Sequence, residues 1–157
     1  MSEIIRFAEE SDCERVAELA RLAWSGIYDG YKAQLGDEIY ETVYENALEI
    51  KAEKMCSAVR DGRVLVCEID GRVAAFASFL AEGEVGALKE NAVAPEYKGR
   101  GIAGRMYDAA IAELKSLGCT VVRVTTGLDD AHAPARRAYE KAGFDHSLSS
   151  IVYYKKI

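Results

Sequence analysis

A chain of 157 residues, half of them hydrophobic and 29% charged, has the composition of one globular domain, so we expect a single domain over residues 1–157. The net charge of −6 argues against nucleic acid as a partner, and no stretch is apolar enough for a membrane span or a signal peptide, which makes the cytoplasm the expected location. The four cysteines are widely spaced and the histidines number two, so we expect neither a disulfide framework nor a metal site.

The first part of the chain is predicted to contain one strand and two helices. Residues 4–7 have strand character, and the capping-box pattern at residues 11–14 predicts a helix that ends near Trp24. Residues 26–36, which begin and end with glycine, are predicted to be a loop. A second helix is predicted from residue 37 to about residue 59.

The remainder alternates strands and helices. A hairpin is predicted where Asp70-Gly71 joins two apolar runs. The predicted strands are 63–69, 73–79, 85–93, 119–125, 144–148 and 151–155, and the predicted helices are 106–117 and 131–142. The order is therefore β-α-α-β-β-β-α-β-α-β-β, which is an α/β (α+β) pattern.

The most informative segment is Ala94–Arg105, A-P-E-Y-K-G-R-G-I-A-G-R, a glycine-rich turn that opens onto a helix. The first backbone N–H groups of a helix have no intrahelical partner and lie at the positive end of its dipole. Glycines at 99, 101 and 104 remove side chains that would block an anion. The segment therefore predicts a site for a pyrophosphate.

The same glycines match the dinucleotide fingerprint, but the context argues against it. Residues 95–98 separate the turn from its strand, and the next strand ends in Thr125-Thr126 rather than in an acid that would hold a ribose. A P-loop is also excluded, because no Gly-Lys-Ser/Thr follows the glycines.

Three segments resemble the GNAT superfamily of N-acetyltransferases. They are residues 90–103 (E-N-A-V-A-P-E-Y-K-G-R-G-I-A), residues 135–144 (A-R-R-A-Y-E-K-A-G-F) and residues 4–12 (I-I-R-F-A-E-E-S-D). The resemblance covers essentially the whole chain. It implies a mixed, mostly antiparallel sheet of about seven strands with four helices, acetyl-CoA as the cosubstrate, no metal, and a homodimer.

The resemblance also implies which residues bind acetyl-CoA. Lys98 stands where the family usually has Arg or Gln, and His132 stands where it often has an asparagine beside the pantetheine arm. The implied residues are Ala92, Val93, Lys98, Gly99, Arg100, Gly101, Ile102, Ala103, Gly104, His132 and Tyr139.

Acetyl transfer to an amine requires a base, a group that polarises the carbonyl, and an acid for the leaving thiolate. Glu90 is the candidate base; the alternatives are a structural carboxylate and a group that only binds the substrate's charge. Tyr139 is the candidate acid, since a phenol stays protonated at neutral pH; the alternative is that its ring only packs on the pantetheine. A backbone N–H near Val93 is the candidate for polarising the carbonyl.

The predicted function is acetyl transfer to a small amine, a peptide N-terminus or a protein lysine, by direct attack in a ternary complex. The alternative is a non-catalytic CoA-binding regulatory or interaction module. Residues 1–60 hold 13 acidic and 7 basic residues, which either attract a cationic amine or are solvated helix faces. The acceptor walls are expected in Trp24–Asp37 and near Leu80–Glu84, and Tyr153-Tyr154 is expected in an interface or the core.

Overall fold

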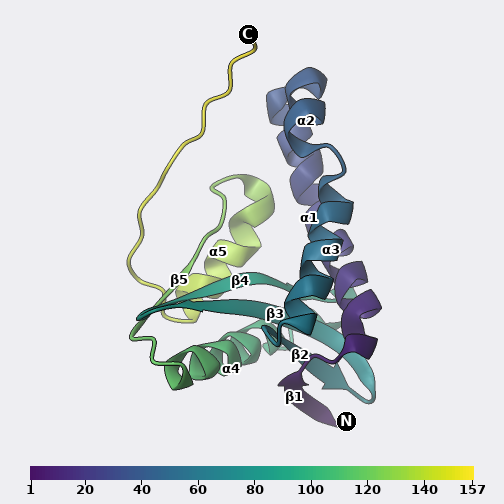
Figure 1. The fold of residues 1–157 in the computed structure, drawn as a ribbon, viewed down its shortest axis with the longest axis vertical. Helices are drawn as coiled ribbons and strands as arrows, with labels where there is room; N and C mark the ends of the chain where they lie inside the picture. Colours follow the sequence, from purple (N-terminus) through teal and green to yellow (C-terminus); the bar gives the residue numbers. More distant parts are fainter.

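The computed structural model describes all residues, 1–157, and contains one five-stranded sheet in the order β1-β2-β3-β4-β5 (Figure 1). Neighbouring strands are antiparallel except β4 and β5, which are parallel. The strands are β1 Glu3–Phe7, β2 Val64–Ile69, β3 Arg72–Glu82, β4 Val85–Val93 and β5 Val121–Val124. The helices are α1 Cys13–Leu35, α2 Asp37–Tyr44, α3 Ala47–Arg60, α4 Ile102–Ser116 and α5 Ala133–Lys141. The predicted mixed, mostly antiparallel α/β fold is confirmed, with five strands instead of seven and five helices instead of four.

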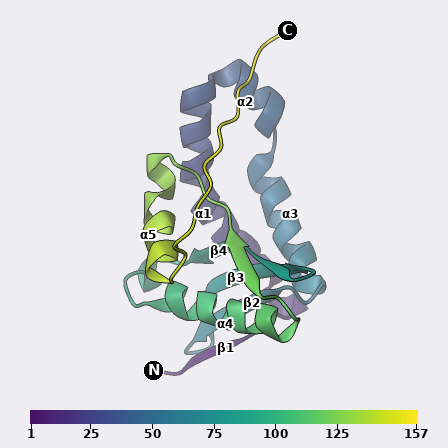
Figure 2. The same cartoon turned by 90° about the vertical axis from the view of Figure 1, so that its left-hand side faces the viewer.

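Helices cover both faces of the sheet, and each face has its own hydrophobic core (Figures 1 and 2). Side chains alternate along β2, so that Val64 and Val66 pack with α1 and α3, whereas Leu65 and Cys67 pack with α4. All four side chains are at most 4% exposed. A sheet that is buried on both faces holds β4, which passes between the two cores, in a fixed position.

The predicted loop at residues 26–36 is wrong, because α1 continues as a helix through Leu35. Gly26 and Gly30 lie inside the helix, where each lowers helix stability by about 1 kcal/mol relative to alanine. Aromatic packing offsets this cost: the rings of Tyr28 and Tyr31 lie 5.9 and 5.3 Å from the ring of Tyr44 in α2. Contacts with a distant segment therefore override the local glycine signal.

Two local features also differ from the prediction. The helix expected at 37–59 is divided into α2 and α3 at Asn46, which adopts a left-handed conformation with φ of 56°. The capping box is formed by Glu9 and Asp12, not by Ser11: the Glu9 amide donates to Asp12 Oδ2 at 2.8 Å. The Asp70-Gly71 hairpin turn is confirmed, with positive φ at both residues.

The strands predicted at 144–148 and 151–155 are not formed. Residues 144–157 are extended outside the sheet and end near α2, where Tyr154 Oη lies 3.4 Å from Tyr44 Oη and Lys156 Nζ lies 2.7 Å from Glu38 Oε2 (Figures 1 and 2). A strand needs a hydrogen-bonding neighbour, and the adjacent strand β5 is only four residues long.

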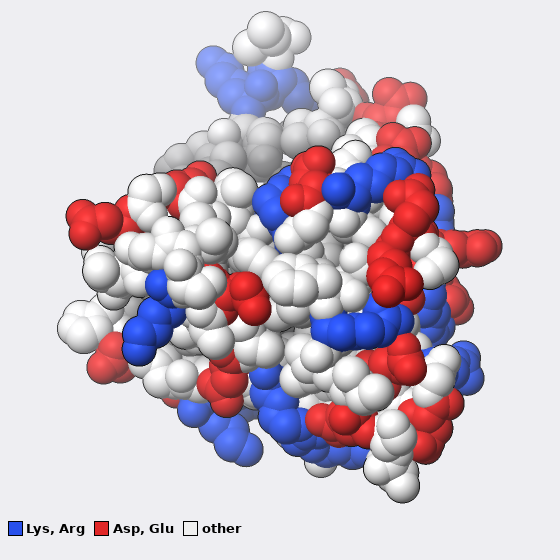
Figure 3. All heavy atoms as spheres, turned by 60° about the horizontal axis from the view of Figure 1, so that its bottom comes forward, with Lys and Arg blue, Asp and Glu red and all other residues white.

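Acidic and basic side chains are interspersed on the face of the molecule in Figure 3, with white surface between them. Opposite charges pair across the surface, as in the bonds from Arg21 to Glu49 and from Arg105 to Glu3. None of the helices combines the length and the apolar composition needed to cross a membrane.

Candidate active site

The site begins at an irregularity in β4. The pairing with β3 moves from Ala77↔Asn91 to Phe79↔Leu88, so β4 has one more residue than β3 across this bulge. Pairing with β5 ends at Leu88↔Val124, while β4 continues to Val93. The two strands therefore separate beyond Leu88, and one edge of β4 is left without a neighbouring strand.

The register determines which amides point into this gap. The Ala94 amide donates to Ala74 O at 2.8 Å, and Val93 is opposite Ala75 in the same ladder. Successive amides of a strand point to opposite sides, so the Val93 N–H points away from β3. It therefore lies on the edge of β4 that has lost β5.

The glycine-rich turn leads directly from this gap into α4. Gly99 and Gly101 have φ of 77° and 72°, a left-handed conformation that favours glycine. The first helical bond runs from Arg105 N to Gly101 O at 3.3 Å, and no side chain caps the helix. The amides of residues 102–104 are therefore free of helical partners and suited to an anion.

A cavity of about 640 Å³ connects the turn with the gap between β4 and β5. Most of the predicted site residues line it, but Arg100 and Gly104 do not: Arg100 donates to Glu96 O and lies over the Tyr97 ring, and Gly104 lies in the first turn of α4. The lining includes Glu90, Ala92, Val93, Lys98, Gly99, Gly101, Ile102, Ala103, His132 and Tyr139.

Tyr139 belongs to a polar group buried between α4, α5 and β4. Asn91 Nδ2 donates to Tyr139 Oη at 2.9 Å, and Tyr107 Oη donates to Asn91 Oδ1 at 3.0 Å. Burial raises the pKa of Tyr139, partly offset by the hydrogen bonds of Asn91 and Tyr107. The Tyr139 phenol is consequently protonated at neutral pH, and because its oxygen accepts from Asn91, its own proton can be donated elsewhere.

Glu90 lies on the opposite face of β4, against α3. Its Oε1 is 2.7 Å from Lys54 Nζ and 3.2 Å from Lys51 Nζ, and Ser78 Oγ donates to its Oε2 at 3.2 Å. Burial alone raises the pKa of Glu90, but the hydrogen bond from Lys54, a backbone hydrogen bond and the charges of both lysines outweigh it and lower the pKa to about 2. Glu90 is therefore a carboxylate at neutral pH.

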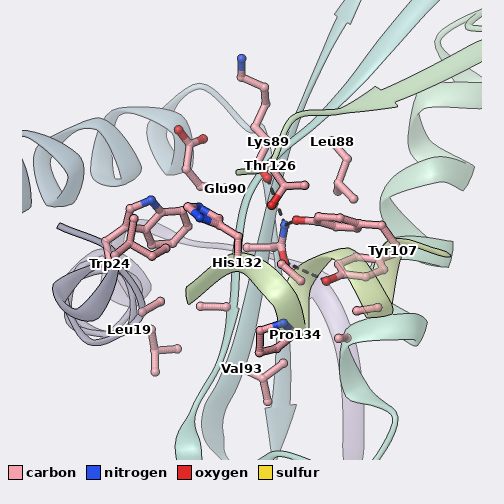
Figure 4. Close-up of a pocket in the computed structure, with 18 of the residues that line it drawn as sticks. Leu19, Trp24, Leu88, Lys89, Glu90, Val93, Tyr107, Thr126, His132 and Pro134 are labelled. Carbon is pink, nitrogen blue, oxygen red and sulfur yellow. Dashed lines mark hydrogen bonds between the residues drawn. The ribbon is translucent and has the colours of Figure 1, made fainter. Parts of the chain in front are cut away.

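His132 lies on the side of the cavity that also holds Trp24, across from Tyr107 (Figure 4). Its Nδ1 is 2.6 Å from Asp129 Oδ1, and its ring stacks on that of Tyr31 with centroids 6.3 Å apart. These contacts fix the ring at the cavity wall, between α1 and the start of α5.

The acetyltransferase (GNAT) family model matches residues 24–144. The chain belongs to the GNAT acetyltransferase family. It is therefore an acyltransferase-family protein, and the resemblance of residues 90–103 and 135–144 to this family is confirmed.

Solved GNAT structures share the fold at low sequence identity. A PaiA N-acetyltransferase from Thermoplasma acidophilum in complex with coenzyme A is 20% identical, with a TM-score of 0.72 over 96% of this chain and 94% of that chain. An aminoglycoside 6′-N-acetyltransferase from Acinetobacter baumannii is also 20% identical, with a TM-score of 0.69 over 99% of each chain. No curated protein sequence matches this chain.

Four residues of this GNAT protein that contact Tyr139, Glu90 or their partners were not predicted from the sequence. Asn91 and Tyr107 position Tyr139, and Lys51 and Lys54 bind Glu90. Asn91 had a signal, because it is a polar residue that alternates with Glu90 along a buried strand. The two lysines had none, since they lie on α3, almost 40 residues earlier in the chain.

Proposed function

We propose that this protein is an acetyl-CoA-dependent N-acetyltransferase that transfers an acetyl group to a primary amine by direct attack in a ternary complex. The observation that carries the proposal is the single cavity lined by the glycine-rich turn, by Glu90 and by Tyr139. One end suits a pyrophosphate, and the two polar side chains come from opposite faces of β4. The acceptor is a small amine, a peptide N-terminus or a protein lysine.

Backbone amides would hold the cosubstrate. The free amides of residues 102–104 and the glycines at 99 and 101 suit its pyrophosphate, and Lys98 lines the same end of the cavity. The pantetheine arm would occupy the gap between β4 and β5, next to His132. The Val93 N–H, directed into that gap by the register, would stabilise the carbonyl oxygen as charge develops on it.

Tyr139 would donate a proton to the departing thiolate. Burial keeps its hydroxyl protonated, and Asn91 fixes the orientation of that hydroxyl at the cavity wall. Glu90 would hold the acceptor's ammonium group. A carboxylate with a pKa of about 2 is too weak a base for an amine of pKa ~10.4, so the proton would leave through water after Glu90 has bound the amine.

Release of free thiol from acetyl-CoA tests the function. The acceptor panel contains monoamines, diamines, amino acids, aminoglycosides and lysine peptides. Tyr139→Phe should lower kcat about 100-fold with little change in the KM for the amine, because a general acid acts in the transition state. Glu90→Gln should raise that KM by about tenfold, since it removes one charge-assisted contact.

Tyr153→Phe is the matched control, because it removes the same hydroxyl from a tyrosine that is 85% exposed in the C-terminal segment. An equal loss of kcat in both tyrosine variants would contradict the role of Tyr139. If the protein binds CoA tightly but releases no thiol with any acceptor, the proposed enzyme is wrong and the non-catalytic CoA-binding module is favoured.

We also propose that the protein is a homodimer in which a second copy covers the C-terminal segment. The support is the exposure of apolar side chains there, since exposed apolar patches are typical of interfaces. The exposed side chains are Leu148, Ile151, Val152 and Tyr153.

A further inference from the structure

The cavity already contains a primary ammonium group that belongs to the chain. Lys51, on α3, lines the cavity, and its side chain is only 17% exposed. Its Nζ lies 3.2 Å from Glu90 Oε1 and 5.0 Å from the centroid of the Trp24 ring. A carboxylate and an aromatic face are the two protein groups that attract an ammonium ion most strongly.

Contacts other than those with Lys51 also hold these two groups, since Ser78 binds Glu90 and Trp24 packs against the core on its side of the sheet. Ser78 Oγ donates to the second carboxylate oxygen of Glu90, and the bulge in β4 sets the position of its backbone. Trp24 lies on α1 among the cavity-lining residues, on the same side as Glu90 (Figure 4). The carboxylate and the indole ring therefore stay in place when the Lys51 side chain moves away, and they can bind the ammonium group of another molecule.

We propose that Trp24 and Glu90 form the binding site for the acceptor's ammonium group, that the acceptor is an unbranched alkyl primary amine, and that Lys51 occupies this site when no acceptor is bound. The inference rests on the proposed function for its last step, acetylation. The occupant defines the class: it is an –NH₃⁺ group at the end of an unbranched alkyl chain, and that group lies between the indole ring and the carboxylate. Lysine side chains and linear diamines have this chemistry.

Lys51 and an acceptor exclude each other. The Lys51 Nζ occupies the position between the Trp24 ring and Glu90 Oε1, so an acceptor's ammonium group can take that position only while the Lys51 side chain has moved away. The apparent affinity for an amine is then reduced by the fraction of time for which the site is open. Lys51 thereby sets the amine concentration at which the site fills.

Lys54 provides a matched control. Its Nζ lies 2.7 Å from the same Oε1, but its side chain is 54% exposed and does not line the cavity. Lys54 neutralises part of the charge of Glu90 from the solvent side, but its ammonium group does not fill the position proposed for the amine. Substituting either lysine removes one positive charge from the same carboxylate, and only substitution of Lys51 empties the site.

Calorimetric titration with n-butylamine, without acetyl-CoA, measures binding separately from catalysis. Lys51→Met should bind n-butylamine about tenfold more tightly than the parent, as expected if the site is open for about a tenth of the time. Lys54→Met should gain much less, because an exposed pair is solvent-screened. Adding Trp24→Leu to Lys51→Met should weaken binding several-fold, since it removes the aromatic face.

Equal affinities for the parent and Lys51→Met, or equal gains for the two lysine variants, would overturn the inference. Circular dichroism melting curves verify that each variant is folded. If the binding pattern holds and no acetyl transfer occurs, the ammonium site stands and the proposed enzyme fails. If transfer to alkylamines occurs with a KM that Lys51→Met and Trp24→Leu leave unchanged, the enzyme stands and this inference fails.

Discussion

At the scale of single residues, two neighbouring side chains of β4 divide the site between the two faces of the sheet. Glu90 contacts Lys51 and Lys54 of α3, whereas Asn91 contacts Tyr107 of α4 and Tyr139 of α5. Alternation along a strand produces this separation. The group that would hold the amine and the group that would protonate the departing thiolate therefore come from different faces of β4.

The pKa of Glu90 predicts how stability depends on pH. Its pKa falls from the ordinary value of 4.5 to about 2 in the folded protein. A lowered pKa means that Glu90 stabilises the fold fully above pH 4.5, and that this contribution is lost as the pH falls from 4.5 towards 2. Urea unfolding at about pH 6 and about pH 3 should show a smaller loss of stability for Glu90→Gln than for the parent.

The exposed carboxylate Glu14 supplies a control for this measurement, as Glu14→Gln. The Glu14→Gln variant should lose as much stability between the two pH values as the parent does. If Glu90→Gln loses as much stability as the parent, Glu90 does not carry the expected linkage.

At the scale of elements, packing decides where helices end. α1 runs through two glycines because its last three turns pack on α2, and it ends at Gly36, where φ is 77°. Within this added length Ile27 lines the cavity, and Tyr31 stacks on His132, which also lines it. A loop at residues 26–36 would leave His132 without the ring that supports it at the cavity wall.

The helical state of residues 26–35 predicts opposite effects for two glycine substitutions. A Cβ at Gly30 meets no atom within 4 Å, so Gly30→Ala should stabilise the protein by about 1 kcal/mol. A Cβ at Gly36 also meets nothing, but φ there is positive, so Gly36→Ala should destabilise it by about 1 kcal/mol. Urea denaturation measures both. Destabilisation by Gly30→Ala would contradict a helix at this position.

At the scale of the whole molecule, the two cores hold residues 1–144 together, while residues 145–157 contact the rest of the protein at few points. Tyr154 meets Tyr44 and Lys156 meets Glu38, both near α2. The apolar side chains between residues 148 and 153 are 70% or more exposed wherever they are large. This exposure is the observation behind the proposed dimer, in which a second copy would bury these side chains.

Sedimentation equilibrium tests whether a second copy supplies that burial. The full chain should sediment as a dimer, and a chain without residues 148–157 should sediment as a monomer with an unchanged circular dichroism spectrum. Ile151→Asp, which keeps the full length and places a charge on a side chain that is 73% exposed, should also weaken the dimer. A monomeric full chain would remove the homodimer from the proposal.

Local chemistry is enough to determine several parts of this protein from its sequence. The glycines at 99 and 101 adopt positive φ in a turn before α4, Asp70-Gly71 forms the hairpin, and Tyr139 lies in the helix that its neighbours predict. Each depends on residues within a few positions along the chain. The family resemblance added a predicted cosubstrate and a predicted reaction class to these local features.

The tertiary structure decided the rest, because the deciding contacts join segments that are distant in sequence. Packing on Tyr44 makes residues 26–35 helical despite two glycines, and Lys51 and Lys54, from α3, lower the pKa of Glu90. The final segment illustrates the same rule: its apolar alternation predicts strands, yet strands form only beside a partner edge. Sequence determines local conformation where steric limits are strong, and long-range packing and charge pairing determine what those elements do together.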